Sequence, residues 1–137
     1  MTQSTLARHD RVVDVITRLP LTAVVVVRQG PQAEPDERRR RKCFEVLLLE
    51  LIEAGCVELV LESRGTRADK RDRDLLDALR ARKQATGLRL SHSPGPADPV
   101  LWIADAMCGA VVADRTGRPR WLTRLEDQVT VLHVDAR

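Results

Sequence analysis

The sequence predicts an α/β protein in which helices cover both faces of a mainly parallel sheet, a three-layer arrangement. Amphipathic segments of helical length alternate with short apolar segments along the whole chain. The connections between the short segments are long enough for a helix, and strands joined in this way run parallel. A length of 137 residues fits one domain. We therefore expect residues 1–137 to form a single α/β domain.

The first 55 residues predict a helix, a strand and a second helix. Residues 4–19 carry apolar side chains at helical spacing, and Pro20 ends the pattern. Residues 22–28 are rich in valine and continuously apolar from Ala23 to Val27, which is typical of a strand that is covered on both faces. After a loop with two prolines, a wide apolar stripe predicts a helix that begins at Asp36 and ends at Gly55.

The rest of the chain continues this alternation. The expected elements are a strand over 57–61, a helix over 69–86, a strand over 88–91, a helix over 99–113, a short helix or turn over 121–127 and a strand over 129–134. Asp69 is expected to cap one helix, because an aspartate side chain accepts hydrogen bonds from the free amides of a first turn. Asp98 and Pro99 begin another, since a proline at the first helical position wastes no donor.

Asp105 is the one charged residue in the otherwise apolar segment 99–113. On a helix it shares a face with Leu101, Cys108 and Gly109. An ionised carboxylate is costly in a dry core, so a face that is both apolar and charged indicates a cleft lined by polar groups or a metal site. The alternative is a position at the helix edge, where an arginine neutralises the carboxylate.

Glu62 directly follows the expected strand over 57–61. In open α/β sheets, ligands bind outside the carboxyl ends of the strands, so an acid at this place is a candidate ligand or catalytic group. The alternative is a structural ion pair with Arg64 or Arg67. His92 stands at the end of another strand, where it either approaches Glu62 or Asp105 or is a turn residue without a role.

Arginines dominate the start of the helix that begins at Asp36, where residues 38–42 are five consecutive cations. Positive charge is unfavourable there, because the helix dipole is itself positive at the amino end. The candidates for contact with nucleic acid are Arg38, Arg39, Arg41 and Arg64. The alternative is that the run is a solvated helix end, since consecutive helical residues point in every direction.

Composition excludes several function classes. The net charge is only +3 and aromatic residues make up 2% of the chain, so stacking surfaces for bases are scarce. No glycine-rich phosphate loop occurs, which argues against the usual nucleotide-binding motifs. No apolar segment is long enough to cross a bilayer, so we expect no membrane contact. The three cysteines lack metal-binding spacing and lie beside apolar residues, which indicates buried, reduced thiols and a cytoplasmic protein.

Two motifs, Leu59-Val60-Leu61-Glu62-Ser63-Arg64 and Pro99-Val100-Leu101-Trp102-Ile103-Ala104-Asp105-Ala106, resemble the domain-of-unknown-function 3800 family. The resemblance extends roughly over residues 6–134. It implies a ribonuclease H-like fold and a nuclease-like activity. It also implies that Glu62 and Asp105 meet in one cleft, as catalytic residues and as ligands of Mg²⁺ or Mn²⁺.

The chain departs from that family at its start. Family members begin with a β-meander whose first strand supplies an aspartate to the metal site, whereas this sequence begins at the following helix. We therefore expect an N-terminally truncated or degenerate domain with a weak site for one ion. A third option, an enzyme for small phosphorylated substrates, lacks a phosphate loop.

The missing meander predicts an open sheet edge at residues 22–28, without a proline or lysine to protect it. Such an edge pairs with a second strand, so we expect a homodimer or a partner chain there. The alternative to a nuclease-like enzyme is therefore a non-catalytic interaction module that binds through this strand.

Overall fold

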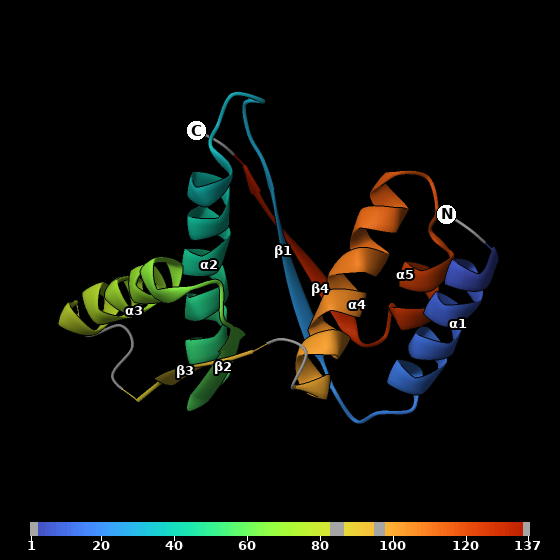
Figure 1. Cartoon of the computed structure of the whole chain (residues 1–137), viewed down its shortest axis with the longest axis horizontal. Helices are drawn as coiled ribbons and strands as arrows, with labels where there is room; N and C mark the ends of the chain where they lie inside the picture. Colours follow the sequence, from blue (N-terminus) through green and yellow to red (C-terminus); the bar gives the residue numbers. More distant parts are fainter. Residues whose placement is uncertain (1–2, 83–86, 95–97, 136–137) are drawn as a thin grey trace. The chain divides into compact units, whose positions relative to one another are not determined.

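The computed structural model describes residues 3–82, 87–94 and 98–135. The elements, in order, are α1 (Gln3–Thr17), β1 (Ala23–Gln29), α2 (Asp36–Glu53), β2 (Glu58–Glu62), α3 (Thr66–Ala81), β3 (Arg89–Ser93), α4 (Pro99–Arg115), α5 (Arg120–Leu125) and β4 (Val129–Asp135). Figure 1 shows this alternation of helices and strands. The predicted α/β class and the order of its elements are confirmed.

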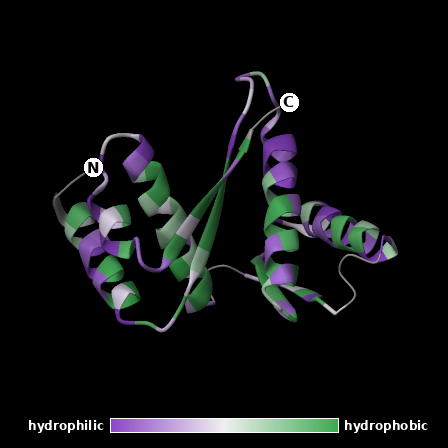
Figure 2. Ribbon diagram, turned by 180° about the vertical axis from the view of Figure 1, so that it is seen from behind, coloured by the Kyte–Doolittle hydropathy of each residue, from purple (hydrophilic) through white to green (hydrophobic). Residues whose placement is uncertain are grey.

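The described strands pair in two small sheets. β2 pairs with β3 in parallel, with Leu61 opposite His92 and Glu62 opposite Ser93. β1 pairs with β4, and Figure 1 shows these two strands side by side and running in the same direction. In Figure 2, β1 is hydrophobic over most of its length, as its run of valines predicts. The parallel pairing agrees with the prediction, but the strands are divided between two sheets where one was expected.

The described residues fall into two compact units. The first, which we call the helical unit, comprises residues 1–25 and 99–132. The second, the α/β unit, comprises residues 26–98 and 133–137. β1 and β4 each begin in the helical unit and end in the α/β unit. Each unit has its own buried residues and is described separately below.

The helical unit is built from α1, α4 and α5, which all contact one another. Its buried hydrophobic residues are Val13, Ile16, Val25, Met107, Ala110, Val111, Trp121 and Leu125. The Gln128 side chain donates hydrogen bonds to the carbonyls of Ile16, at 2.9 Å, and Leu19, at 3.2 Å. These bonds satisfy carbonyls at the carboxyl end of α1 and fix that end to the turn before β4.

Asp10 on α1 holds α5 through two donors. Its carboxylate accepts a hydrogen bond of 2.9 Å from Nε1 of the buried Trp121 and one of 2.6 Å from the Arg120 guanidinium. The bond from Trp121 and the charge of Arg120 hold the pKa of Asp10 below its ordinary value of 3.8. The ionised carboxylate therefore stabilises the folded helical unit.

A pH series tests this contribution. Because the folded pKa of Asp10 lies below 3.8, its stabilising effect is complete above that pH and is lost as the pH falls through the folded pKa. Asp10→Asn keeps an acceptor for Trp121 but removes the charge. We expect the melting temperatures of wild type and variant, followed by circular dichroism, to differ near pH 7 and to converge toward about pH 2. A difference that stays constant over this range would contradict the assignment.

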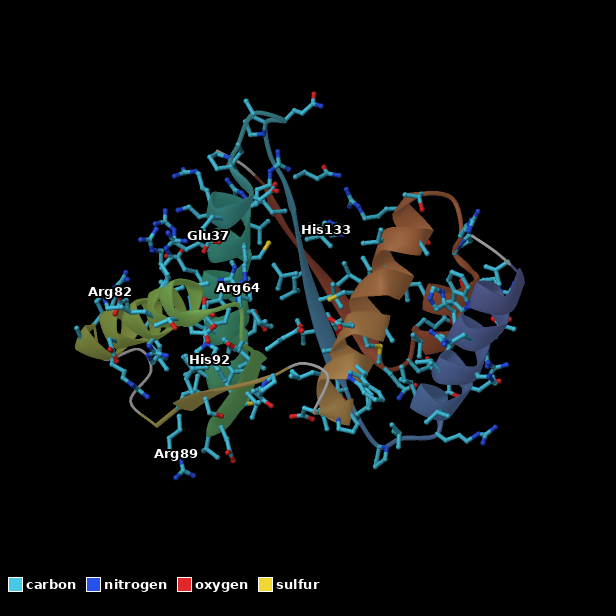
Figure 3. The ribbon with its side chains drawn as sticks, viewed as in Figure 1. Glu37, Arg64, Arg82, Arg89, His92 and His133 are labelled. Atoms are coloured by element: carbon cyan, nitrogen blue, oxygen red, sulfur yellow. The ribbon has the colours of Figure 1, made fainter. Side chains whose placement is uncertain are left out.

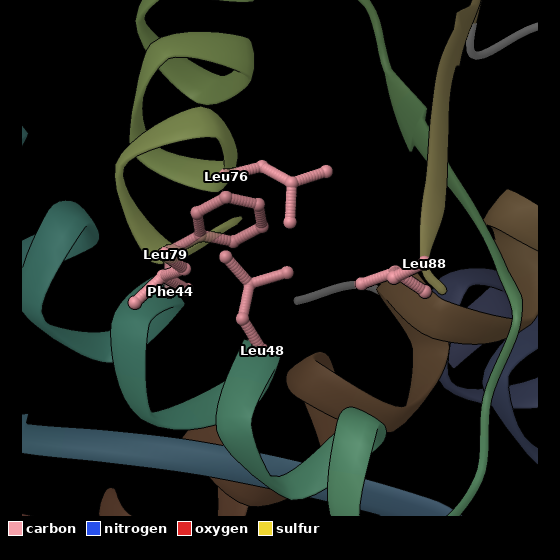
Figure 4. Close-up of a cluster of buried hydrophobic side chains, with 5 residues drawn as sticks. All are labelled: Phe44, Leu48, Leu76, Leu79 and Leu88. Atoms are coloured by element: carbon pink, nitrogen blue, oxygen red, sulfur yellow. The ribbon is translucent and has the colours of Figure 1, made fainter. Parts of the chain in front are cut away.

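In the α/β unit, α2 and α3 pack on one face of the β2–β3 sheet. Figure 4 shows the buried cluster, which consists of Phe44, Leu48, Leu76, Leu79 and Leu88. The half-buried Leu59 and Leu61 of β2 pack against it, whereas Glu58, Val60 and Glu62 are exposed. Because side chains alternate along a strand, one face of β2 meets the helices and the other carries the two acids. This pair of strands and its two helices form two layers.

Several local predictions are corrected. Helix α3 begins at Thr66, three residues before the expected start, so Asp69 lies inside the helix and does not cap it. The residue before the helix is Gly65, with a φ of +101°, a conformation that glycine adopts without strain. Cys43 is half-buried, but Cys56 and Cys108 are exposed, contrary to the expected burial, and all three are free thiols.

Within the described residues, no helix combines the length and the apolar character needed to cross a membrane.

Candidate metal centre

Asp69 is held in place by the turn between β2 and α3. One of its carboxylate oxygens accepts a hydrogen bond of 2.6 Å from the Ser63 hydroxyl, and the other accepts one of 2.9 Å from the backbone amide of Arg64. The residue is only 7% exposed. These two donors, with the Ser63 bond first, hold the pKa of Asp69 below its ordinary range. Asp69 is therefore an ordered, ionised carboxylate on the inner side of α3.

Asp72 lies one turn further along α3, on the same face as Asp69, and is 3% exposed. Its two oxygens accept a bidentate pair of hydrogen bonds from Arg40 of α2, at 2.7 and 3.2 Å. A guanidinium nitrogen of Arg64 lies 3.5 Å from the same carboxylate. Bidentate geometry of this kind is among the strongest that a carboxylate forms with a side chain.

His92 comes from β3 and completes the group. Its Nε2 atom lies 3.4 Å from Oδ2 of Asp72 and 3.7 Å from Oδ1 of Asp69, and its side chain is 9% exposed. Leu61 is its partner in the parallel register, so His92 lies on the sheet face that meets the helices. Figure 3 shows His92 on the helix side of β3 and Arg89 pointing away.

The three side chains form a group that could hold a metal ion. One ligand atom from each of Asp69, Asp72 and His92 lies within 4.8 Å of the others. Two carboxylates and one imidazole are suitable donors for a divalent first-row ion. The Ser63 and Arg64 donors to Asp69 orient it, as hydrogen bonds from outside the ligand set do at protein metal sites. The charges of Arg40 and Arg64 balance the two carboxylates when no cation is bound.

A cleft of about 510 Å³ lies between α2 and α3, beside this group. Its lining residues are Glu37, Arg38, Arg40, Arg41, Phe44, Arg71, Asp72, Asp74 and Leu75. Asp72 thus belongs both to the Asp69–Asp72–His92 group and to the wall of the cleft. A ligand in the cleft would reach the candidate metal site from this side.

The predicted acids lie elsewhere. Glu62 is exposed on the face of β2 opposite to the core, so it does not share a face with His92. Asp105 is exposed on α4, in the helical unit, where it lines a pocket of about 290 Å³. Glu62 and Asp105 belong to different units. The site built from these two acids therefore stays a prediction.

The face of α4 that carries Asp105, Cys108 and Gly109 is not the one that packs in the core, contrary to the expectation from its apolar neighbours. Met107, Ala110 and Val111 are buried, whereas Asp105, Cys108 and Gly109 are exposed. Because α4 is apolar on nearly all sides, its sequence does not show which side packs against α1 and α5. The exposed position removes the cost that burial of Asp105 was expected to carry.

Most of the predicted nucleic-acid contacts are engaged within the α/β unit. Arg38 lies 3.7 Å from Glu34, and Arg39 donates to the Glu34 carbonyl at 3.3 Å and to that of Pro31. Arg64 pairs with Glu37, at 3.2 Å. Glu34 and Glu37 lie next to the basic run and neutralise part of it. Arg41, by contrast, is exposed and forms no ion pair with any described residue.

Asp69 and Asp72 were not predicted as site residues, because Asp69 was expected to cap the helix. One available signal was the spacing of three residues, which places both acids on one helical face directly after a strand. The other was His92 at the end of a neighbouring parallel strand.

Comparison with known proteins gives no assignment: no protein-family model, no curated protein and no solved structure matches the chain. The likeness to the domain-of-unknown-function 3800 family rests on two short motifs and stays a prediction.

Proposed function

We propose that the chain binds one divalent cation, Mn²⁺ or Mg²⁺, through Asp69, Asp72 and His92. We further propose that this centre supports hydrolysis of phosphate esters, the nuclease-like activity that the motif resemblance implies. One observation carries the metal proposal, namely two buried carboxylates and an imidazole whose ligand atoms lie within 4.8 Å of one another. The residues of the centre are then not Glu62 and Asp105.

The donor set favours Mn²⁺ over Mg²⁺. Magnesium prefers oxygen ligands and retains several waters, whereas an imidazole nitrogen suits a first-row transition ion. When bound, such an ion supplies Lewis-acid stabilisation to a phosphate oxygen. Among the residues themselves, Asp69 is fixed by Ser63 and Arg64, and Asp72 accepts a bidentate pair of hydrogen bonds from Arg40.

A Mn²⁺ titration followed by electron paramagnetic resonance tests the metal site, because bound Mn²⁺ loses the sharp signal of the free ion. We expect one site per chain, and at least about a tenfold loss of affinity in His92→Ala, since even residues outside the ligand set change metal affinity that much. Asp77→Asn is the matched control, because Asp77 lies on the same helix and its side chain is 66% exposed. The control should bind like wild type.

Two further variants compare this site with the pair of acids predicted from sequence. Glu62→Gln and Asp105→Asn should leave Mn²⁺ affinity unchanged, because both residues are exposed and lie outside the Asp69–Asp72–His92 group. Loss of binding in these variants, with His92→Ala unaffected, would favour the original two-acid site.

Hydrolysis is tested separately in the presence of Mn²⁺, with a chromogenic phosphate monoester as a small substrate and with fluorescent RNA and DNA oligonucleotides as the class that the motif resemblance implies. We expect cleavage by wild type and by Asp77→Asn, and none by His92→Ala. Cleavage that persists in His92→Ala would identify a contaminant or a different centre. Mn²⁺ binding without cleavage would restrict the proposal to metal binding.

A second candidate function rests on β1. Among the described strands it pairs only with β4, so its other edge has no described strand beside it. Four consecutive valines, residues 24–27, make this strand suited to pair with a second copy or with a partner chain. Size-exclusion chromatography with light scattering should then show a dimer. A monomer at every concentration would argue against self-pairing.

A further inference from the structure

We propose that the cleft between α2 and α3 binds the phosphate group of a small phosphorylated ligand beside the metal. We further propose that Arg40 changes partner from Asp72 to this phosphate, so that metal and ligand bind cooperatively. This inference rests on the proposed metal site and names the ligand class that the site takes.

The cleft presents more than one cation to an incoming anion. Four arginines line it: Arg38, Arg40, Arg41 and Arg71. Arg41 is exposed and forms no ion pair with a described residue, and Arg71 forms only a long one within the described part of the chain, with Glu37 at 3.9 Å. A guanidinium offers parallel donors that match the oxygens of a phosphate. Arg41 and Arg71 can therefore bind a phosphate without losing a strong ion pair.

Arg40 connects the cleft with the metal ligands. It lines the cleft and donates to both oxygens of Asp72, and Oδ2 of Asp72 also faces His92 at 3.4 Å. A cation held by Asp72 and His92 would compete with the guanidinium for these oxygens and repel it. Arg40 then needs another anion, and the cleft is the place where one can enter.

Phe44 keeps Arg40 near that position. The guanidinium carbon lies 5.3 Å from the centre of the Phe44 ring, a cation–π contact that does not depend on Asp72. The Arg40 side chain is 31% exposed, so it can turn toward the cleft without first leaving a closed core. Because binding free energies are linked, phosphate must raise metal affinity by the same factor as metal raises phosphate affinity.

The dimensions of the cleft favour a small ligand over a nucleic-acid strand. A volume of about 510 Å³ lies within the range of roughly 300–1,000 Å³ that small-molecule sites occupy. Phe44 is the one aromatic residue of the lining and is 5% exposed, so it offers no surface on which bases could stack. A phosphate monoester has three terminal oxygens, enough to contact a metal and two arginines at once.

Mn²⁺ titrations with and without phenylphosphonate, a phosphate analogue that cannot be hydrolysed, test the inference. We expect phenylphosphonate to raise Mn²⁺ affinity at least about fivefold, a coupling of ordinary size. Calorimetry should show that Mn²⁺ raises phenylphosphonate affinity by the same factor. Arg41→Gln should weaken phenylphosphonate binding and leave binding of Mn²⁺ alone unchanged. Arg89→Gln is the control, because Arg89 is exposed on β3 and lies outside the cleft.

Arg40→Gln tests the exchange itself. Glutamine keeps one donor for Asp72 but has no charge, so Mn²⁺ alone should bind at least as tightly as in wild type, and the effect of phenylphosphonate should be clearly smaller, since only its direct contact with the metal remains. If Arg40→Gln instead weakens binding of Mn²⁺ alone, Arg40 supports the metal site. The proposed change of its partner from Asp72 to the phosphate is then wrong. Circular dichroism checks that each variant is folded.

The remaining outcomes separate this inference from the proposed function. Mn²⁺ binding that phenylphosphonate does not change would overturn the inference and leave the metal site intact. Absence of Mn²⁺ binding would overturn both. If a short oligothymidylate raises Mn²⁺ affinity and phenylphosphonate does not, the ligand is a polynucleotide and the small-ligand assignment is wrong.

Discussion

Leu48→Ala is expected to lower the free energy of unfolding of the α/β unit by about 3 kcal/mol, within the range of roughly 2–5 kcal/mol for such replacements in a core. Leu48 is 0% exposed and belongs to the cluster that joins α2 and α3 to the β2–β3 sheet. The replacement removes buried methyl groups and leaves a cavity that neighbouring side chains fill only in part. Urea unfolding followed by far-ultraviolet circular dichroism measures the loss.

The adjacent residue provides the matched control. Leu49 lies on the same helix and is 42% exposed, so Leu49→Ala makes the same chemical change outside the core. Its effect should be about 0.5 kcal/mol or less, as is usual for surface positions. Equal losses in the two variants would mean that Leu48 does not occupy the centre of the core.

Asp72→Leu is expected to destabilise the α/β unit by about 2–3 kcal/mol and to abolish Mn²⁺ binding. Removing one partner of a buried ion pair costs roughly 3–5 kcal/mol, because it leaves the other charge without compensation. Asp72 is 3% exposed, but the Arg40 side chain is 31% exposed and recovers some hydration, which lowers the expected cost. Thermal and urea unfolding, compared with Asp77→Asn, measure the effect.

A double-mutant cycle separates the ion pair from other roles of Asp72. Adding Arg40→Leu to Asp72→Leu removes the uncompensated guanidinium, so part of the lost stability should return. Mn²⁺ binding should stay lost, because a leucine at position 72 offers no ligand. Strictly additive destabilisation in the double variant would contradict a direct pairing of Arg40 with Asp72.

The order of elements could be predicted because its signals are local. The apolar stripe of α2, the valine run of β1 and the prolines between them each specify one element without reference to the rest of the chain. Strand pairing is a long-range property, and the sequence did not show that the strands divide between two sheets. In β2, exposed and half-buried residues alternate, which is typical of a strand with one covered face, but the apolar Val60 hides this alternation in the sequence.

The candidate site was harder to predict because it joins three elements. Glu62 was expected at the end of a strand, and it is the last residue of β2, but its side chain lies on the exposed face. Because side chains alternate along a strand, a shift of one residue decides which face a side chain occupies. His92 was recognised as a strand-end residue, yet its neighbours Asp69 and Asp72 come from α3. Arg40, which pairs with Asp72, lies 32 residues away in the sequence. No local pattern specifies a contact of that kind.

The placement of the aromatic residues has a practical consequence for spectroscopy. Trp102 and Trp121 are the two tryptophans of the chain, which has no tyrosine, and both belong to the helical unit. Intrinsic indole emission therefore reports on that unit alone, while the α/β unit, whose aromatic residue is Phe44, gives no comparable signal. Denaturation curves recorded by emission and by dichroism will coincide only if both units unfold in one cooperative transition.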